Sequence, residues 1–186
     1  MKNVLIVSGH PDLAHDSAAT KVILAALEEH IPDAVIDRLS DLYPDYKIDV
    51  PAEQAKLEAA DIVVLQFPVF WYAMPSLLQK WMEDTFRHGW SHGTTGNALQ
   101  GKKVVVSCTT GAPIELYAKD APMGHTVEEL FNNVESMAKM TGMEFAGMVY
   151  TGGVSYQMRE TEEGMEQIKE KTRDHADRLV ALLKTL

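Results

Sequence analysis

Three consecutive aromatic residues follow an apolar run that has the character of a buried strand: Phe70, Trp71 and Tyr72 lie between Pro68 and Pro75. Proline lacks the N–H that a sheet ladder needs and restrains the residue before it, so this segment cannot continue as regular strand. Aromatic side chains on a loop at the carboxyl end of a strand favour a platform for a flat ligand. A hydrophobic loop packed under a neighbouring helix or a second subunit explains the same residues, and the segment alone does not separate the two.

A second group of residues suited to ligand binding follows the first apolar run, at Gly9-His10-Pro11. Ser17 and Ala18 then open a helix whose first N–H groups and dipole suit a phosphate. Ordinary capping by Asp16 or Ser17 accounts for this pattern without a ligand. The chain contains neither a dinucleotide G-x-G-x-x-G fingerprint nor a Walker A motif, which argues against the NAD Rossmann and P-loop classes.

A third group follows the fourth apolar run: Thr109, Thr110, Gly111 and Ala112, with Tyr117 a few residues later. Hydroxyls, free N–H groups and a glycine that permits close backbone approach could serve the polar rim of a flavin ring. Donors near the N1–O2 edge would raise the affinity of a flavin for electrons. Tyr117 and His125 are the residues able to donate or shuttle a proton there. A plain turn could contain the same residues.

The elements that must position these groups are five apolar runs alternating with helical stretches. We expect strands at 4–7, 34–39, 62–67, 104–108 and 145–150, and helices at 18–30, 52–60, 76–86, 126–141 (capped by Gly142) and 161–186. Such alternation predicts a parallel sheet with helices on both faces. The expected fold is α/β, a flavodoxin-like doubly wound sheet of five strands in the order 2-1-3-4-5, with ligands outside the carboxyl ends of the strands.

Composition narrows the class of protein. With 186 residues, 46% of them hydrophobic, we expect one domain spanning residues 1–186. The formal net charge of −10 argues against nucleic acid as a partner. No run has the length of a membrane span and no signal peptide is evident, which favours a cytoplasmic protein. The single cysteine, Cys108, excludes an intrachain disulfide and is expected to be buried.

Together these segments resemble the NAD(P)H:quinone oxidoreductase family of flavodoxin-like flavoproteins, which includes DT-diaphorase and shorter bacterial relatives. The resemblance covers nearly the whole chain. It is carried by Gly9-His10-Pro11 with Ser17, by 66–75 and its continuation 78–86, and by Thr109-Thr110-Gly111 with Tyr117.

The resemblance implies functional residues position by position. Cofactor contacts fall on His10, Ser17 and Ala18 near the phosphate, on Pro68, Val69, Phe70, Trp71 and Tyr72 beside the ring, and on Thr109, Thr110, Gly111, Ala112 and Tyr117 at the opposite edge. Trp90, Ser91 and His92 are implied to shape the quinone site of the partner subunit. Tyr117 and His125 are the implied catalytic residues; no metal ligand is implied. The chain departs from longer members in having Met123 where they carry a histidine, with His125 two residues further on, and Ala112-Pro113 where they carry more glycine.

The implied activity is that of an NAD(P)H dehydrogenase (quinone). Hydride passes from NAD(P)H to flavin N5 and then to a quinone or other small acceptor, in a two-electron ping-pong reaction. The cofactor is expected to be FMN, with FAD as the alternative; the choice between NADH and NADPH stays open. A homodimer is implied, and we expect it to bury Met74, Leu77, Leu78, Trp81 and Met82, unless these residues face the sheet of their own subunit.

Two other functions remain open at this point. A one-electron flavodoxin-type carrier shares the fold and the acidic balance, although such carriers have a Thr/Ser-rich phosphate loop where this chain has Gly9-His10-Pro11-Asp12. Short relatives also include the ancillary regulatory flavoprotein of a glutathione-gated potassium-efflux system. That resemblance implies a membrane potassium-efflux protein as a possible partner.

Overall fold

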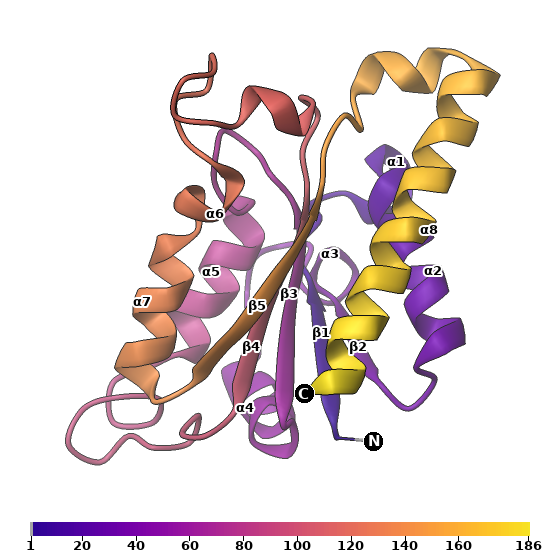
Figure 1. Ribbon diagram of the computed structural model, residues 1–186. Coiled ribbons are helices and arrows are strands. Elements are labelled where there is room, and N and C mark those ends of the chain that lie inside the picture. The colour runs from indigo at the N-terminus through magenta and orange to yellow at the C-terminus, as the bar shows by residue number, and fades with distance from the viewer. Residues whose placement is uncertain (1) are drawn as a thin grey trace.

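The computed structural model describes residues 2–186 and contains one parallel sheet of five strands (Figure 1). The strands are β1 (Val4–Ser8), β2 (Val35–Arg38), β3 (Ile62–Pro68), β4 (Lys103–Thr109) and β5 (Glu144–Thr151). Their order is β2-β1-β3-β4-β5, which confirms the predicted fold class and strand order. The register pairs Ser8 with Gln66 and Pro68 with Thr109, so the three candidate segments leave the sheet at the same edge.

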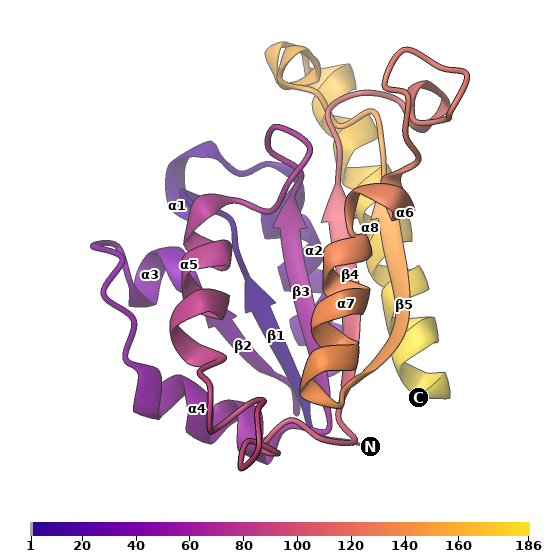
Figure 2. The ribbon, with the colours of Figure 1, turned by 90° about the vertical axis from the view of Figure 1, so that its left-hand side faces the viewer.

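Helices cover both faces of the sheet (Figures 1 and 2). On one face lie α2 (Ala19–His30) and α8 (Glu162–Thr185), and on the other α4 (Val50–Ala59), α5 (Ser76–Thr85), α6 (Val127–Leu130) and α7 (Asn132–Thr141). Two short helices, α1 (Leu13–Asp16) and α3 (Leu39–Leu42), and two 3-10 helices, η1 (Ile114–Leu116) and η2 (Tyr156–Glu160), complete the fold. Within residues 2–186 no helix has the length and apolar character needed to cross a membrane.

The strands alternate their side chains between two apolar clusters, because successive residues of a strand point to opposite faces. Leu5 and Val63 belong to the cluster under α5 and α7, whereas Ile6 and Val64 belong to the cluster under α2 and α8. Cys108 is fully buried in the first cluster, as expected. The five apolar residues expected at a dimer contact are already buried in that same cluster within one chain: Met74, Leu77, Leu78, Trp81 and Met82. The expectation that they form the subunit contact is therefore wrong.

Two local predictions also need correction. The helix predicted at 126–141 is divided into α6 and α7 at Phe131, whose buried ring packs edge-on against Phe67 with 5.1 Å between centroids. Asp16 does not cap α2: the cap residue is Ala18, which forms no side-chain capping hydrogen bond, whereas the Ser17 hydroxyl accepts the N–H of Lys21 in the first turn at 3.3 Å. Asp16 is instead the last residue of α1, a helix of four residues that is too short to show a helical hydrophobic pattern. Gly142 ends α7 in the left-handed conformation, as predicted.

Candidate functional site

A cavity of about 150 Å³ lies at the carboxyl edge of the sheet, between the segments that follow β1, β3, β4 and β5. Its lining includes most of the residues that the sequence assigns to a cofactor: His10, Ser17, Ala18, Pro68, Val69, Phe70, Thr109, Thr110 and Gly111. The remaining lining residues are Ala19, Thr20, Val154, Tyr156 and Arg159. The fold thus brings together three segments that are far apart in the sequence, at the place where doubly wound sheets bind ligands.

One end of the cavity is formed by the amino terminus of α2. The N–H groups of Ala18, Ala19 and Thr20 form no hydrogen bond with any other residue of the range 2–186. The Ser17 hydroxyl accepts a hydrogen bond from the N–H of Lys21 at 3.3 Å, which leaves these three donors free. Unpaired N–H groups at the positive end of a helix dipole suit an anion such as a phosphate.

His10 lies beside this helix end and is only 3% exposed. Its Nδ1 accepts a hydrogen bond from the N–H of Asp12 at 3.2 Å, so in the neutral ring the proton is on Nε2. Burial, the largest cause, lowers the pKa of His10, and the Asp16 carboxylate opposes part of that shift. His10 therefore presents a neutral N–H donor at neutral pH.

The aromatic segment forms a two-residue hairpin turn. Phe70 and Ala73 exchange two backbone hydrogen bonds of 3.0 Å, while Trp71 and Tyr72 have φ of 50° and 63°. Positive φ at both central positions is typical of a type I′ turn, which usually carries Asn and Gly. Neither the Trp71 nor the Tyr72 N–H donates a hydrogen bond within residues 2–186, so both backbone donors remain available.

The turn separates the three aromatic side chains. Phe70 lines the cavity, and its ring meets that of His10 edge-on with 6.2 Å between centroids. Trp71 is 94% exposed, and the Tyr72 hydroxyl donates to Sδ of Met123 at 3.3 Å. The structure therefore brings the side chain of Phe70 to the cavity and leaves those of Trp71 and Tyr72 outside it.

The loop after β4 forms another part of the cavity wall, next to the segment after β3. The Thr110 hydroxyl donates to the carbonyl of Ala112 at 2.8 Å, and that carbonyl also accepts the N–H of Gly153 at 2.9 Å. Ala112 supports this wall without lining the cavity. Tyr117 lies just behind it at the end of η1, where burial raises the pKa of its hydroxyl and the neighbouring Thr110 offsets part of the shift.

His125 lies outside the cavity. Its side chain is 67% exposed, and its Nδ1 is 3.4 Å from the carboxylate of Glu129 on α6. Residues 118–123, which follow Tyr117, form turns and bends. Nothing in this arrangement brings the imidazole to the lining residues.

Trp90, Ser91 and His92 lie at the amino edge of the sheet, beyond the end of α5 (Figure 2). Nε1 of Trp90 donates to the Glu58 carboxylate of α4 at 2.8 Å. The cavity is at the opposite, carboxyl edge, and a seven-residue strand such as β3 separates the two edges by about 23 Å. These residues therefore cannot reach the cavity of their own chain. Contact with a cavity would require a second subunit.

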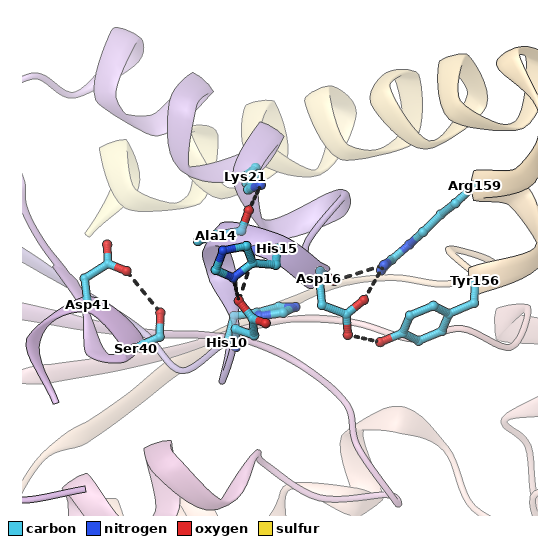
Figure 3. A network of polar contacts seen from close by, with 10 residues as sticks. His10, Ala14, His15, Asp16, Lys21, Ser40, Asp41, Tyr156 and Arg159 are labelled. Atoms are coloured by element: carbon cyan, nitrogen blue, oxygen red, sulfur yellow. Dashed lines mark hydrogen bonds and ion pairs between the residues drawn. The ribbon is translucent and has the colours of Figure 1, made fainter. Parts of the chain in front are cut away.

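Tyr156 and Arg159 are lining residues that the sequence analysis missed. Both come from η2, directly after β5, and both bond to Asp16 (Figure 3). The Arg159 Nε is buried and has no hydrogen-bond partner within the described range. One signal could have revealed them: the segment after the fifth strand leaves the same sheet edge as the other three.

A family model described as a flavodoxin-like fold matches residues 2–176. An uncharacterized NAD(P)H oxidoreductase of Bacillus subtilis (strain 168), YrkL, is 32% identical over 184 residues, 99% of this chain and 98% of that protein. The glutathione-regulated potassium-efflux system ancillary protein KefF of Enterobacter sp. (strain 638) is 43% identical over 109 residues, 58% of this chain and 60% of that protein. The crystal structure of general stress protein 14 from Treponema denticola, in complex with FMN, has a TM-score of 0.85 and 30% identity, covering 97% of this chain and 99% of that one.

Proposed function

This chain belongs to the family of proteins with a flavodoxin-like fold, and from that premise we propose that it is an FMN-dependent NAD(P)H:quinone oxidoreductase. The observation that carries the proposal is the cavity where the segments after β1, β3 and β4 meet, with free helix N–H groups at one end. Similarity to an NAD(P)H oxidoreductase over 99% of the chain and to a protein crystallised with FMN supports it. We further propose that residues 1–186 act as one flavin-binding domain in the cytoplasm.

The residues at the helix end fit the phosphate of FMN. Three free N–H groups of α2, the Nε2–H of His10 and the unpartnered Nε of Arg159 are all donors. Among residues 2–186 no carboxylate lines the cavity, and Asp16, which directly precedes the lining residue Ser17, is already paired with Arg159. A dianion placed here gains charge-assisted hydrogen bonds with little repulsion.

The other end fits a flat ring with a polar rim. Pro68, Val69 and Phe70 line it together with Thr109, Thr110 and Gly111 of the neighbouring segment, and the free N–H groups of Trp71 and Tyr72 lie on the adjoining turn. The enclosed volume of about 150 Å³ is below the range of about 300–1,000 Å³ that is typical of small-molecule sites. The ring would therefore extend to the open mouth, where a second flat molecule could stack on it.

Bound FMN would supply the redox chemistry, accepting hydride from NAD(P)H and then reducing a quinone in a ping-pong reaction. The chain's part is to hold the ring, to direct backbone and hydroxyl donors at its negatively charged edge, and to cover one face. Tyr117 is the proposed proton donor: it lies at the end of η1, next to the wall formed by Thr109, Thr110 and Gly111, and a tyrosine hydroxyl is protonated at neutral pH. His125, on the exposed side of the same loop region, is the second candidate. In a homodimer, Trp90, Ser91 and His92 of one subunit would complete the acceptor site of the other.

The test is to purify the protein, record its visible absorbance and identify any released cofactor by mass. Oxidation of NADPH and NADH is then followed with a soluble benzoquinone as acceptor. We expect a yellow protein that releases FMN and oxidises at least one nucleotide only when the quinone is present. A colourless protein that binds neither FMN nor FAD contradicts the proposal, and reduction in two well-separated one-electron steps would favour a flavodoxin-type carrier instead.

A second candidate is a regulatory role at a potassium-efflux system, alongside the reductase activity. It is favoured by the 43% identity to KefF, which extends over 58% of this chain. Co-purification with a tagged potassium-efflux protein from the same organism would support it. If the two proteins do not co-purify while FMN binding and quinone reduction are intact, the regulatory role is contradicted and only the reductase function remains supported.

A further inference from the structure

A buried chain of hydrogen bonds connects α8 to the sheet through His175, which is fully buried on that helix. Its Nε2 is 2.7 Å from the Ser107 hydroxyl of β4, and its Nδ1 is 3.0 Å from the Thr151 hydroxyl of β5. Ser107 in turn donates to Oε1 of Gln66 on β3 at 2.5 Å. We call these four residues, Gln66, Ser107, Thr151 and His175, the His175 network.

The hydrogen bonds of the His175 network all run in one direction. The NH2 group of Arg178 donates to the Thr151 hydroxyl at 2.7 Å, which leaves the hydrogen of that hydroxyl for Nδ1 of His175. Since Ser107 donates to Gln66, the ring of His175 carries its proton on Nε2 and donates it to the Ser107 oxygen. The imidazole therefore fixes the hydroxyl of Ser107, and this hydroxyl fixes Gln66.

The Gln66 side chain depends on this chain of bonds for its orientation. It is fully buried, and its Nε2 has no hydrogen-bond partner among residues 2–186. Ser8, its register neighbour on β1, also has a buried hydroxyl without a partner in that range. Within the described part of the chain, the bond from Ser107 is therefore the one hydrogen bond that holds the side-chain amide of Gln66.

The His175 network lies one layer below the cavity. Side chains two residues apart on a strand point to the same face of the sheet, about 7 Å from each other. Gln66 and Ser107 are register neighbours, and two residues further along the same strands Pro68 and Thr109 are register neighbours that line the cavity. The network therefore supports the part of the wall that Pro68 and Thr109 form.

We propose that His175 is a positioning residue for the flavin site: through Ser107 and Gln66 it holds the ends of β3 and β4 in the arrangement that receives the flavin ring. This inference rests on the proposed function, because it concerns the same cavity. Loss of the imidazole removes one partner from each of the buried Ser107 and Thr151 hydroxyls, and these groups regain a partner only if side chains or strand ends shift. A shift of this kind weakens a site, because binding needs the supporting residues to be held in place.

The experiment is a titration of full-length, flavin-depleted protein with FMN and with riboflavin, followed by quenching of flavin fluorescence. His175→Leu should raise both Kd values by the same factor, about two- to tenfold, which is what the net contribution of one hydrogen bond corresponds to. The factor is shared because both ligands carry the ring, whereas only FMN carries the phosphate. The visible absorption band of the bound flavin should also shift. His175→Gln keeps an N–H donor and an acceptor, so it should regain most of the lost affinity.

Two further variants separate positioning from stability. Ser107→Ala removes the hydroxyl that links His175 to Gln66 and should raise both Kd values by a factor similar to that of His175→Leu. Thr172→Val also removes a buried hydroxyl from α8, one turn before His175, but this hydroxyl donates only to carbonyls of its own helix. Its effect should be confined to the midpoint of thermal unfolding, with both Kd values and the spectrum of the bound flavin unchanged.

The outcomes separate this inference from the proposed function. Unchanged Kd values in His175→Leu overturn the inference, as does a loss of affinity for FMN that riboflavin does not share. An equal loss of affinity in Thr172→Val also overturns it, because the effect would then follow stability alone. If His175→Leu does not fold, unchanged Kd values in Ser107→Ala overturn it. In all these cases flavin binding by the unaltered protein still supports the proposed function, whereas unaltered protein that binds no flavin overturns the proposed function and the inference with it.

Discussion

The backbone of Phe70 pairs with that of Ala73 through two hydrogen bonds of 3.0 Å, closing a turn around Trp71 and Tyr72. Both central residues have positive φ, a conformation that bulky L-residues rarely adopt. Such strain is about 1–3 kcal/mol per residue and persists where the surrounding structure enforces it. Here the same conformation leaves two N–H groups free beside the candidate cavity.

Replacing Tyr72 with glycine should stabilise the protein. Glycine adopts positive φ without steric strain, so we expect Tyr72→Gly to raise the midpoint of thermal unfolding, with a gain of about 1 kcal/mol. The control is Tyr156→Gly, at an exposed tyrosine without positive φ, which should lower the midpoint. A lower midpoint for Tyr72→Gly would show that its contact with Met123 outweighs the strain.

Gly9 and Gly111 should respond differently to a methyl group. A Cβ on Gly9 would lie 2.5 Å from the Cβ of Leu78, which α5 holds against the sheet, whereas one on Gly111 would meet nothing nearer than 3.9 Å. We expect Gly9→Ala to lower the free energy of unfolding by about 1–3 kcal/mol, as overpacking of a core does, and Gly111→Ala to leave it nearly unchanged. Urea unfolding of the two variants checks this, and equal losses would contradict it.

Asp37 should destabilise the protein increasingly as the pH rises. It is buried, and burial, helped by the nearby Glu53 carboxylate, raises its pKa to about 6 despite the Lys56 ammonium at 2.8 Å. Because the pKa is higher in the folded state, the contribution of Asp37 to stability is fully present below about pH 4 and is lost as the pH rises towards 6. Asp37→Asn should therefore gain stability relative to the unaltered protein over this interval and keep that gain above it.

Urea unfolding between pH 4 and 8 measures the difference for Asp37→Asn. In the variant Lys56 keeps its ion pair with Glu53 at 2.7 Å, so the ammonium charge remains paired. Asp45→Asn, at an exposed site paired with Lys47, serves as the control and should show no such gain. A stability difference for Asp37→Asn that does not change with pH would refute the prediction.

His175 should stay neutral in mildly acidic solution. Its Nε2 is 2.7 Å from the Ser107 hydroxyl and its Nδ1 3.0 Å from that of Thr151, and burial lowers its pKa to about 3. The Ser107 hydroxyl donates to Gln66 at 2.5 Å, so Nε2 carries the proton and Nδ1 accepts from Thr151. NMR signals of this imidazole should keep the neutral position down to pH 5, and a change centred near pH 6 would contradict the assignment.

His175 should also make the stability of the protein depend on pH. A histidine whose pKa is lower in the folded state stabilises the fold only while its ring is neutral. Its contribution to the free energy of unfolding is therefore complete above the pKa of about 6.5 that it has in the unfolded chain. That contribution is lost as the pH falls towards 3. We therefore expect His175 to contribute to acid unfolding, measurable as a flatter acid limb of the stability curve in His175→Gln, even if that variant is less stable at neutral pH.

Most of the fold could be predicted because its determinants are local. The apolar runs that contain Ile6 and Val64 lack period-two alternation, which requires a sheet covered on both faces, and each is followed by a helical stretch. The short helix α1 escaped prediction because four residues carry no helical period. The division at Phe131 escaped because it depends on a ring from another element, Phe67.

The sequence by itself determined the parallel sheet, its strand order and the meeting of the segments around His10, Phe70 and Thr110, since the carboxyl ends of parallel strands share one edge. Only the tertiary structure decided that Arg159 and Tyr156 join Asp16, because contacts between segments so far apart depend on how the loops cross the sheet. It also decided that Phe70 lines the cavity while Trp71 does not. The positive φ values of Trp71 and Tyr72 reverse the chain between Phe70 and Ala73, and no pattern of residue types in this segment predicts that reversal.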